Sequence, residues 1–172
     1  MKPLLIVLSG LPFSGKSTLA KDLATALDLP VVSYDNDIYA KHKHEVPNGA
    51  SAAEEFEVVQ AIARRYIAEK LMAGESFIYD DLGLQKEERE SIRKIAENSG
   101  ARYILLFLDT PVSIIEQRRK DNDRSNIRGH IKDEKMSLNI SLLEKPDSDE
   151  QAIVVHPEMS LNHIITVIRS LD

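Results

Sequence analysis

The sequence of 172 residues contains no cysteine, no apolar run long enough to cross a bilayer and no excess of positive charge. Without cysteine, the chain can form no disulfide, thiolate zinc site or iron–sulfur cluster, and it has no cysteine nucleophile. A bilayer span needs about 20 consecutive apolar residues, whereas the apolar run at residues 4–8 is far shorter. That run also leads into Gly and Ser without the cleavage pattern of a signal peptide. We therefore expect a cytoplasmic protein with no membrane partner.

The residues that are present are typical of one globular domain. Hydrophobic residues make up 42% and charged residues 29% of the chain, with 7 glycines and 7 prolines, values that exclude a disordered or collagen-like protein. At roughly 150 residues per domain, we expect residues 1–172 to form a single domain. The 22 Lys and Arg are outnumbered by 28 Asp and Glu, which gives a net charge of −6. Because proteins that bind duplex nucleic acid are usually basic, this charge disfavours a nucleic-acid partner without excluding one.

Short apolar runs alternate with helix-forming segments along the whole chain. The runs expected to be strands are residues 4–8, 31–34, 76–80, 102–109 and 152–155. Strands separated by helices form a parallel sheet covered on both faces, so the pattern predicts an α/β fold. Ser51 and Glu54 have capping-box spacing at the start of a long helix. On that helix we interpret Phe56 and Tyr66 as core residues.

The residues that carry chemistry follow the first apolar run. The segment GLPFSGKST, which begins at Gly10, contains the pattern G-x-x-x-x-G-K-[ST] between an expected strand and an expected helix, as a phosphate-binding P-loop requires. Gly10 and Gly15 let backbone N–H groups point at phosphate oxygens, and the helix start adds partial positive charge. We expect Lys16 to reach the β- and γ-phosphates, Ser17 to ligate Mg²⁺ and Thr18 to contact the α-phosphate. The residues predicted to bind ATP in this segment are Gly10, Pro12, Phe13, Ser14, Gly15, Lys16, Ser17 and Thr18.

Two later strands are expected to end in carboxylates. Asp80 and Asp81 follow one apolar run, and Asp35 follows another. In a parallel sheet all strand carboxyl ends open on the same edge, so these residues should lie near the P-loop. A P-loop needs a metal-side carboxylate, and we favour Asp80 over Asp81 because it directly follows the apolar run. Asp35 is expected to act as the base that accepts the proton of an attacking hydroxyl; a helix cap is the alternative interpretation of this segment.

A polar segment at about residues 120–137 is interpreted as a short lid. Residues 118–135 contain seven cations and four carboxylates, a local charge of +3 in an acidic protein. A solvated loop is the alternative, but a triphosphate must be neutralised during transfer, and an arginine in cis is a common means. Arg118 and Arg119 are the favoured phosphate contacts, followed by Arg124; spacing does not decide among them.

These segments together resemble the small P-loop kinases of the AAA_33-type ATP-binding family. That group is related to polynucleotide 5′-hydroxyl kinases, chloramphenicol phosphotransferase, zeta toxins and gluconate kinases. GLPFSGKST resembles the family loop GLPGSGKST, and VVSYD resembles its strand that ends in the acceptor-side aspartate. FIYDDLGLQKEER places Asp80 and Arg89 in the family pattern, and LLFLDTPVSIIEQRR leads to the lid arginines. The resemblance implies a P-loop fold with a five-stranded parallel sheet in the order 2-3-1-4-5, helices on both faces and a lid.

Three departures from the family bear on the acceptor. Ile38 stands where polynucleotide kinases have an arginine, and residues 81–83 are Asp-Leu-Gly where those kinases often have Thr-Asn. Both changes remove groups that would hold a substrate phosphate. Phe13 replaces a loop glycine and is expected to narrow the acceptor pocket.

The sequence therefore favours a kinase that moves the γ-phosphoryl group of ATP to a hydroxyl of a small molecule, with Mg²⁺ as cofactor. The alternatives are a 5′-hydroxyl polynucleotide or nucleoside kinase, an ATP-binding protein without transfer activity, and a GTP-dependent switch. A D-x-x-G pattern at residues 80–83 fits a switch, but the chain has no N-K-x-D motif to read guanine. Adenine is expected to bind near the His156-Pro157 turn. The pattern is compatible with a monomer or a homodimer and does not identify the acceptor.

Overall fold

One five-stranded sheet organises the protein in the computed structural model, which describes residues 2–125 and 130–171. The strands are β1 (Leu4–Ser9), β2 (Val31–Ser33), β3 (Phe77–Asp80), β4 (Arg102–Leu108) and β5 (Ile153–Val155). They lie in the order β2-β3-β1-β4-β5, and each neighbouring pair is parallel. The predicted α/β fold and the strand order implied by the family resemblance are both confirmed.

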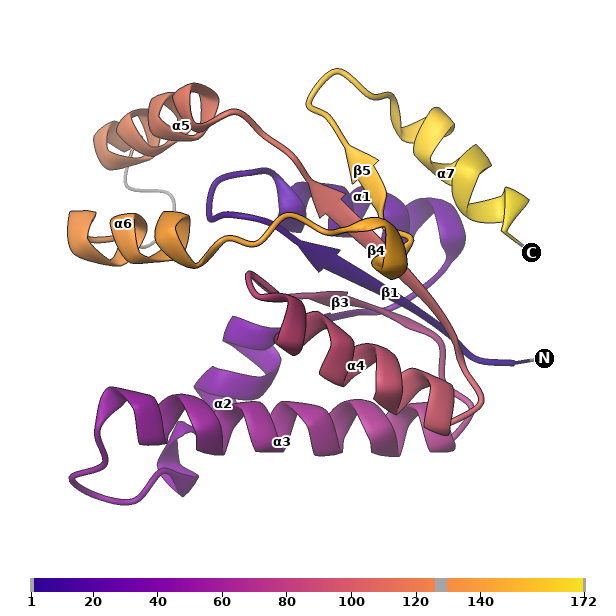
Figure 1. The fold of residues 1–172 in the computed structure, drawn as a ribbon, viewed down its shortest axis with the longest axis horizontal. Helices are drawn as coiled ribbons and strands as arrows, with labels where there is room; N and C mark the ends of the chain where they lie inside the picture. The colour runs from indigo at the N-terminus through magenta and orange to yellow at the C-terminus, as the bar shows by residue number, and fades with distance from the viewer. Residues whose placement is uncertain (1, 126–129, 172) are drawn as a thin grey trace.

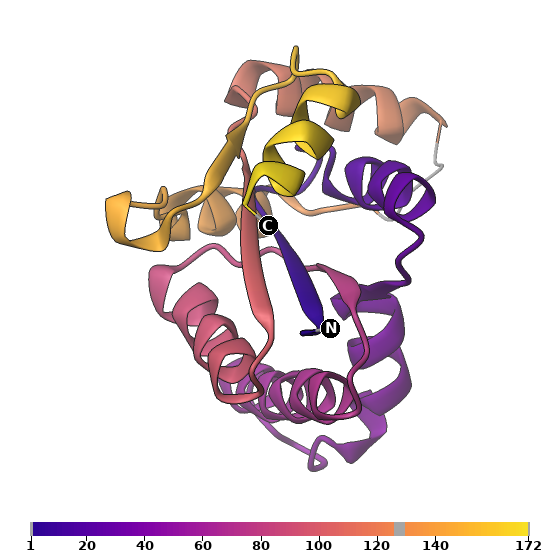
Figure 2. The ribbon, with the colours of Figure 1, turned by 90° about the vertical axis from the view of Figure 1, so that its right-hand side faces the viewer.

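Helices cover both faces of the sheet (Figures 1 and 2). The long helices are α1 (Lys16–Leu27), α3 (Ala52–Met72), α4 (Lys86–Asn98), α5 (Val112–Ser125), α6 (Asp133–Leu142) and α7 (Leu161–Ser170). Helices α3 and α4 lie on one face, and α1 and α7 lie on the other. Helices α5 and α6 lie beyond the carboxyl ends of the strands, the edge where P-loop proteins bind ligands (Figure 1). No helix in the described ranges is long and apolar enough to cross a membrane.

The central strand explains why the first apolar run is uninterrupted. Along β1, Leu5 and Val7 pack into the core under α3 and α4, whereas Ile6 and Leu8 pack into the core under α1 and α7. Successive side chains on a strand point to opposite faces, so a strand covered on both faces needs apolar residues at every position. A smaller third core, which contains Leu11, packs beneath α5 and α6.

The segment after β2 is irregular. It consists of a π-helical turn, η1 (Tyr34–Tyr39), then α2 (Ala40–His42) and a 3₁₀ turn, η2 (Lys43–Glu45). A second 3₁₀ turn, η3 (Ser148–Glu150), precedes β5. π-Helical turns are rare in proteins, but those that occur are often found at functional sites. The predicted base, Asp35, is the second residue of η1.

One sequence-based expectation is wrong. Phe56 is not a core residue, because 43% of its surface is exposed on the first turns of α3; Tyr66 is half-buried and packs on the core. Within the segment interpreted as a lid, α5 continues to Ser125 and α6 begins at Asp133. Its residue Arg128 lies outside the described residues. The capping box at Ser51 is confirmed.

Candidate active site

The loop between β1 and α1 has the backbone geometry of a phosphate cradle. Gly10 has φ +142° and Gly15 has φ +111°, and a Cβ on Gly10 would lie 3.0 Å from the backbone oxygen of Leu108. Only glycine fits such a position without strain. Phe13 also adopts a positive φ, +62°. Glycine adopts such angles more easily than other residues do, which explains why the family has glycine at this position.

Lys16 and the start of α1 supply the positive charge of the loop. The Lys16 side chain is 8% exposed, and its Nζ donates hydrogen bonds of 2.8 Å to the backbone oxygens of Gly10 and Leu11. The ammonium is thereby held across the loop. Ser17 and Thr18 are exposed on the first turn of α1, where the backbone N–H groups of a helix favour anions.

The environment of the Ser14 side chain indicates that the loop can bind a phosphate group. Its Oγ is buried and has no hydrogen-bond partner within the described residues, and buried hydroxyls are normally bonded. The backbone oxygen of the same residue accepts hydrogen bonds from Thr110 Oγ1 at 2.9 Å and from Arg118 Nη1 at 2.8 Å. The loop is therefore fixed from outside, while a donor inside it is left for a ligand.

The residues after β3 brace the P-loop from the acceptor side. The backbone N–H of Gly10 donates to the oxygen of Leu82 at 2.9 Å, and Ser9 Oγ donates to the oxygen of Gly83 at 2.8 Å. A Cβ on Gly83, which has φ +50°, would lie 3.4 Å from Ser9. The loop that begins with Asp80 and Asp81 is thus tied directly to the phosphate cradle.

The predicted lid arginines have three different environments. Arg118 of α5 reaches the P-loop, where its Nη1 donates to the oxygens of Phe13 at 3.0 Å and Ser14 at 2.8 Å. Arg119 instead pairs with Asp133 of α6 and so links the two helices. The side chain of Arg124 is 80% exposed. The structure brings Arg118 to the loop and does not bring Arg119 or Arg124 there; their roles toward phosphate stay predictions.

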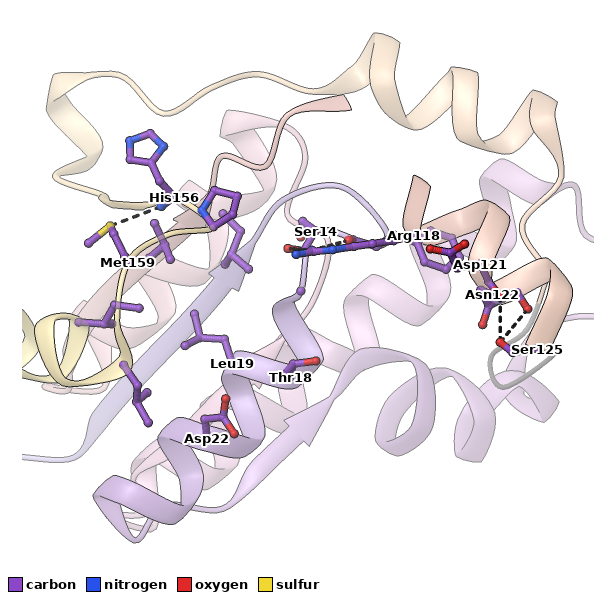
Figure 3. Close-up of a pocket in the computed structure, with 17 residues that line it drawn as sticks. Ser14, Thr18, Leu19, Asp22, Arg118, Asp121, Asn122, Ser125, His156 and Met159 are labelled. Carbon is purple, nitrogen blue, oxygen red and sulfur yellow. Dashed lines mark hydrogen bonds between the residues drawn. The ribbon is translucent and has the colours of Figure 1, made fainter. Parts of the chain in front are cut away.

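A cavity of about 610 Å³ opens beside the P-loop (Figure 3). Arg118 and the residues after it on α5 lie on one side, and His156 and Met159, from the connection between β5 and α7, lie on the other. Thr18 and Leu19 of α1 line the space between them. Binding cavities for small molecules have volumes of about 300–1,000 Å³, so this one can hold a nucleoside. It includes the turn at which we expect adenine.

Carboxylates lie on the other side of the P-loop, at the ends of β2 and β3. Ser33 pairs in register with Asp80, so η1 begins beside the end of β3. Asp35 is exposed on η1, and the caps of this segment are formed by Ser33 and Asp37. Asp35 is therefore not the helix cap that was the alternative interpretation. Its role as a base stays a prediction.

Asp81 is held in an unfavourable environment for a charge. Burial raises its pKa to about 7, and the nearby carboxylates of Glu88 and Asp35 act in the same direction. The N–H of Leu82, which donates to Asp81 Oδ1 at 2.7 Å, and the ammonium of Lys16 act in the opposite direction. This coupling links the acceptor side to the P-loop lysine.

For Mg²⁺, the chain offers the Ser17 hydroxyl and a carboxylate at the end of β3. Within residues 2–125 and 130–171, no three His, Asp or Glu side chains converge on one metal position. Mg²⁺ fits such a site, because it is usually held by one or two carboxylates together with water and substrate phosphates. The structure does not decide between Asp80 and Asp81.

Arg89 has a structural environment that the sequence did not reveal. It is 2% exposed, and its guanidinium forms a bidentate pair with Glu150 at 2.6 and 2.7 Å. Its Nη1 also donates to the backbone oxygens of Gly83, Leu84 and Glu144. The family resemblance places Arg89 but not Glu150, since no local pattern connects residues 61 positions apart. Arg89 fixes the loop that braces the P-loop.

The strand order, the P-loop and the helices over its edge define the fold of a P-loop kinase. The AAA_33 family model, described as an AAA domain, matches residues 5–139. The chain therefore belongs to this family. None of the curated proteins compared with the chain matches its sequence.

Solved structures of kinases share this fold. A sugar kinase from Janibacter sp. HTCC2649 has a TM-score of 0.71 at 20% identity, over 98% of this chain and 93% of that one. A gluconokinase from Sinorhizobium meliloti 1021 has a TM-score of 0.66 at 20% identity, over 96% and 89%. An APS kinase from Mycobacterium tuberculosis, in complex with AMPPNP and APS, has a TM-score of 0.68 at 18% identity, over 99% and 97%. At these identities the likeness establishes the fold.

Proposed function

We propose that this protein is a kinase that transfers the γ-phosphoryl group of ATP to a hydroxyl group of a small molecule. The observation that carries the proposal is the placement of a P-loop and an exposed carboxylate, Asp35, on the same sheet edge. Both Asp35 and Lys16 act electrostatically on the carboxylate of Asp81. The kinase neighbours and the family membership support the same reading. In this proposal one domain carries the whole reaction, with α5 and α6 as its lid.

Each part of the site has its own role in the proposed reaction. The P-loop N–H groups, Lys16 and Arg118 bind the triphosphate and offset the negative charge that shifts during transfer. Ser17 and Asp80 would hold Mg²⁺, which would supply positive charge to offset that of the triphosphate. The cavity beside His156 holds the nucleoside.

The transfer step balances with one proton acceptor. The acceptor hydroxyl oxygen forms a bond to the γ-phosphorus while the bond from that phosphorus to the β–γ bridging oxygen breaks, which releases ADP. The hydroxyl proton goes to the carboxylate of Asp35. A carboxylate exposed to solvent can serve in this role.

The test is a transfer assay with labelled ATP over a panel of sugars, nucleosides, amino alcohols and 5′-hydroxyl oligonucleotides. We expect a small hydroxyl compound to be phosphorylated, and we expect Asp35→Asn to lower kcat by about 10²-fold or more with ATP affinity unchanged. Asp28→Asn is the matched control, because Asp28 is an exposed aspartate at the far end of α1. Full transfer by Asp35→Asn would overturn the assignment of the base, and phosphorylation of oligonucleotides alone would overturn the small-molecule acceptor.

A further inference from the structure

Five acidic or phenolic side chains gather where the acceptor of the proposed reaction must bind. We refer to them as the acidic cluster. Its members come from the turn η1, from β3 and the residue that follows it, and from the first turn of α4: they are Tyr34, Asp35, Tyr79, Asp81 and Glu88. The largest electrostatic influences on the Tyr79 phenol come from the other four members. Three of those four, with Tyr39, also act on Tyr34.

The Tyr79 hydroxyl is an unsatisfied group inside the cluster. Tyr79 is fully buried, and its hydroxyl has no hydrogen-bond partner within the part of the chain that the structure describes. A buried polar group without a partner destabilises the folded protein, and such groups in native proteins call for an explanation. Carboxylates are strong acceptors, yet the phenol forms no bond to them. A ligand group that enters among those carboxylates would supply the missing partner.

The charge of the cluster determines which ligand fits. Lys16 is the cation that acts on Asp81, and in the proposed function its charge is directed at the phosphates of ATP. Two basic residues of the neighbouring elements have other partners: Arg89 pairs with Glu150, and Lys41 pairs with Asp37. The acidic cluster thus contributes three carboxylates to this part of the site. An anionic acceptor would be repelled there, because like charges at close range raise the free energy of binding.

The cluster is also not arranged as a compact metal centre. Its carboxylates belong to three separate elements, and no three of the described acidic or histidine side chains converge on one metal position. Carboxylates spread in this way can accept hydrogen bonds from different protons of an organic ammonium group, which carries three donors as the lysine side chain does.

We propose that the acceptor is an amino alcohol or amino sugar, whose protonated amine binds to Glu88, Asp81 and the Tyr79 hydroxyl while its hydroxyl faces Asp35. This inference rests on the proposed kinase function and names the substrate class of that site. The amine keeps its charge during the reaction. The oxygen–phosphorus bond forms at the hydroxyl, the bond to ADP breaks, and the proton of the hydroxyl passes to Asp35.

The experiment compares probes that differ in one group. The first set is glucosamine, glucose and glucuronate; the second is 3-amino-1-propanol, 1,3-propanediol and 3-hydroxypropanoate. Binding of each is measured by calorimetry with Mg²⁺ and a non-hydrolysable ATP analogue, and transfer is measured with labelled ATP. We expect an amine to bind at least tenfold more tightly than its neutral partner and to be phosphorylated with the higher kcat/KM. The anions should bind most weakly.

Three variants locate the selectivity. Glu88 accepts a hydrogen bond from the N–H of Gln85 as part of the α4 capping box, which glutamine also permits. Glu88→Gln should therefore fold normally and lose most of the preference for the amine. Glu87→Gln, an exposed neighbour on the same helix, should keep that preference. Tyr79→Phe should weaken amine binding about three- to tenfold without loss of protein stability, since the hydroxyl has no partner to lose.

The outcomes separate the two claims. Preferred binding and phosphorylation of the neutral or anionic probes would overturn the amine assignment and leave the kinase function standing. Unchanged amine preference in Glu88→Gln would also overturn the assignment. If ATP binds and no acceptor of any charge is phosphorylated, the kinase function itself fails, and the acceptor assignment fails with it.

Discussion

On the nucleotide side of the sheet edge, backbone groups and glycine conformations form the site, whereas on the proposed acceptor side charged and phenolic side chains form it. The P-loop is held by hydrogen bonds from Thr110 and Arg118, and its positive φ angles fix the cradle before any phosphate arrives. The acidic cluster contains like charges and a buried hydroxyl without a partner. A rigid phosphate cradle suits a nucleotide, which many proteins bind. Side chains without partners suit the selection of one particular acceptor.

Removal of the Lys16 ammonium is expected to have the largest effect. We expect Lys16→Ala to lower kcat by about 10³-fold or more, because a charge aimed at the transferred group stabilises the transition state more than the ground state. A steady-state transfer assay measures this loss. Lys21→Ala is the matched control, since Lys21 is exposed on the same helix. Transfer at the unmodified rate by Lys16→Ala would remove the P-loop from the mechanism.

Breaking the buried ion pair between Arg89 and Glu150 is expected to lower the stability of the folded protein and not only the rate of transfer. Arg89→Met leaves the carboxylate of Glu150, which is 5% exposed, without its partner. Loss of one member of a buried ion pair costs about 3–5 kcal/mol, measured here as the free energy of unfolding in urea. Arg93→Met should cost less than about 1 kcal/mol, because the ion pairs of Arg93 are partly exposed. Equal losses in the two variants would contradict the bracing role of Arg89.

The two adjacent lid arginines should differ in their contribution to transfer. Arg118→Ala is expected to lower kcat by about 10²-fold, because its guanidinium already lies on the P-loop. Arg119→Ala should act mainly on the link between α5 and α6 and lower kcat by less than about tenfold. Measurement of both variants under saturating ATP ranks them. A larger loss in Arg119→Ala than in Arg118→Ala would reverse the assignment.

The pH dependence of the free energy of unfolding should reveal the raised pKa of Asp81. The folded pKa of Asp81, about 7, lies above its ordinary value of 3.8, so the folded protein keeps a proton that the unfolded chain releases between these values. Its contribution to stability is complete below pH 3.8 and is lost as the pH rises through 7. The loss is on the order of 2 kcal/mol for a partly exposed group.

The matching experiment is urea unfolding at pH 5 and pH 8 without nucleotide or Mg²⁺. Asp81→Asn should remove most of this decrease, whereas Asp28→Asn should preserve it. If Asp81→Asn shows the same decrease as the parent protein, the assignment of the pH dependence to Asp81 is wrong.

The sequence predicted the nucleotide side better than the acceptor side for a physical reason. A P-loop depends on local geometry, so Gly10, Gly15 and Lys16 show their role through spacing alone. The acidic cluster combines residues of η1, β3 and α4. Tyr79 and Glu88 lie within the segment FIYDDLGLQKEER, but the family pattern assigns roles there only to Asp80 and Arg89. The same reason explains the error at Phe56. Its spacing matches the buried face of α3, but the first turns of that helix are not covered by the core.

The most direct test of the kinase account is phosphorus NMR of a reaction with Mg²⁺, ATP and each of the six acceptor probes. The account predicts that ADP and a phosphomonoester of one probe appear in equal amounts. Lys16→Ala should abolish both signals, and Asp35→Asn should reduce them together. Inorganic phosphate as the sole product beside ADP, at the same rate with and without every probe, would show that water rather than a hydroxyl compound receives the phosphoryl group. That result would contradict the account.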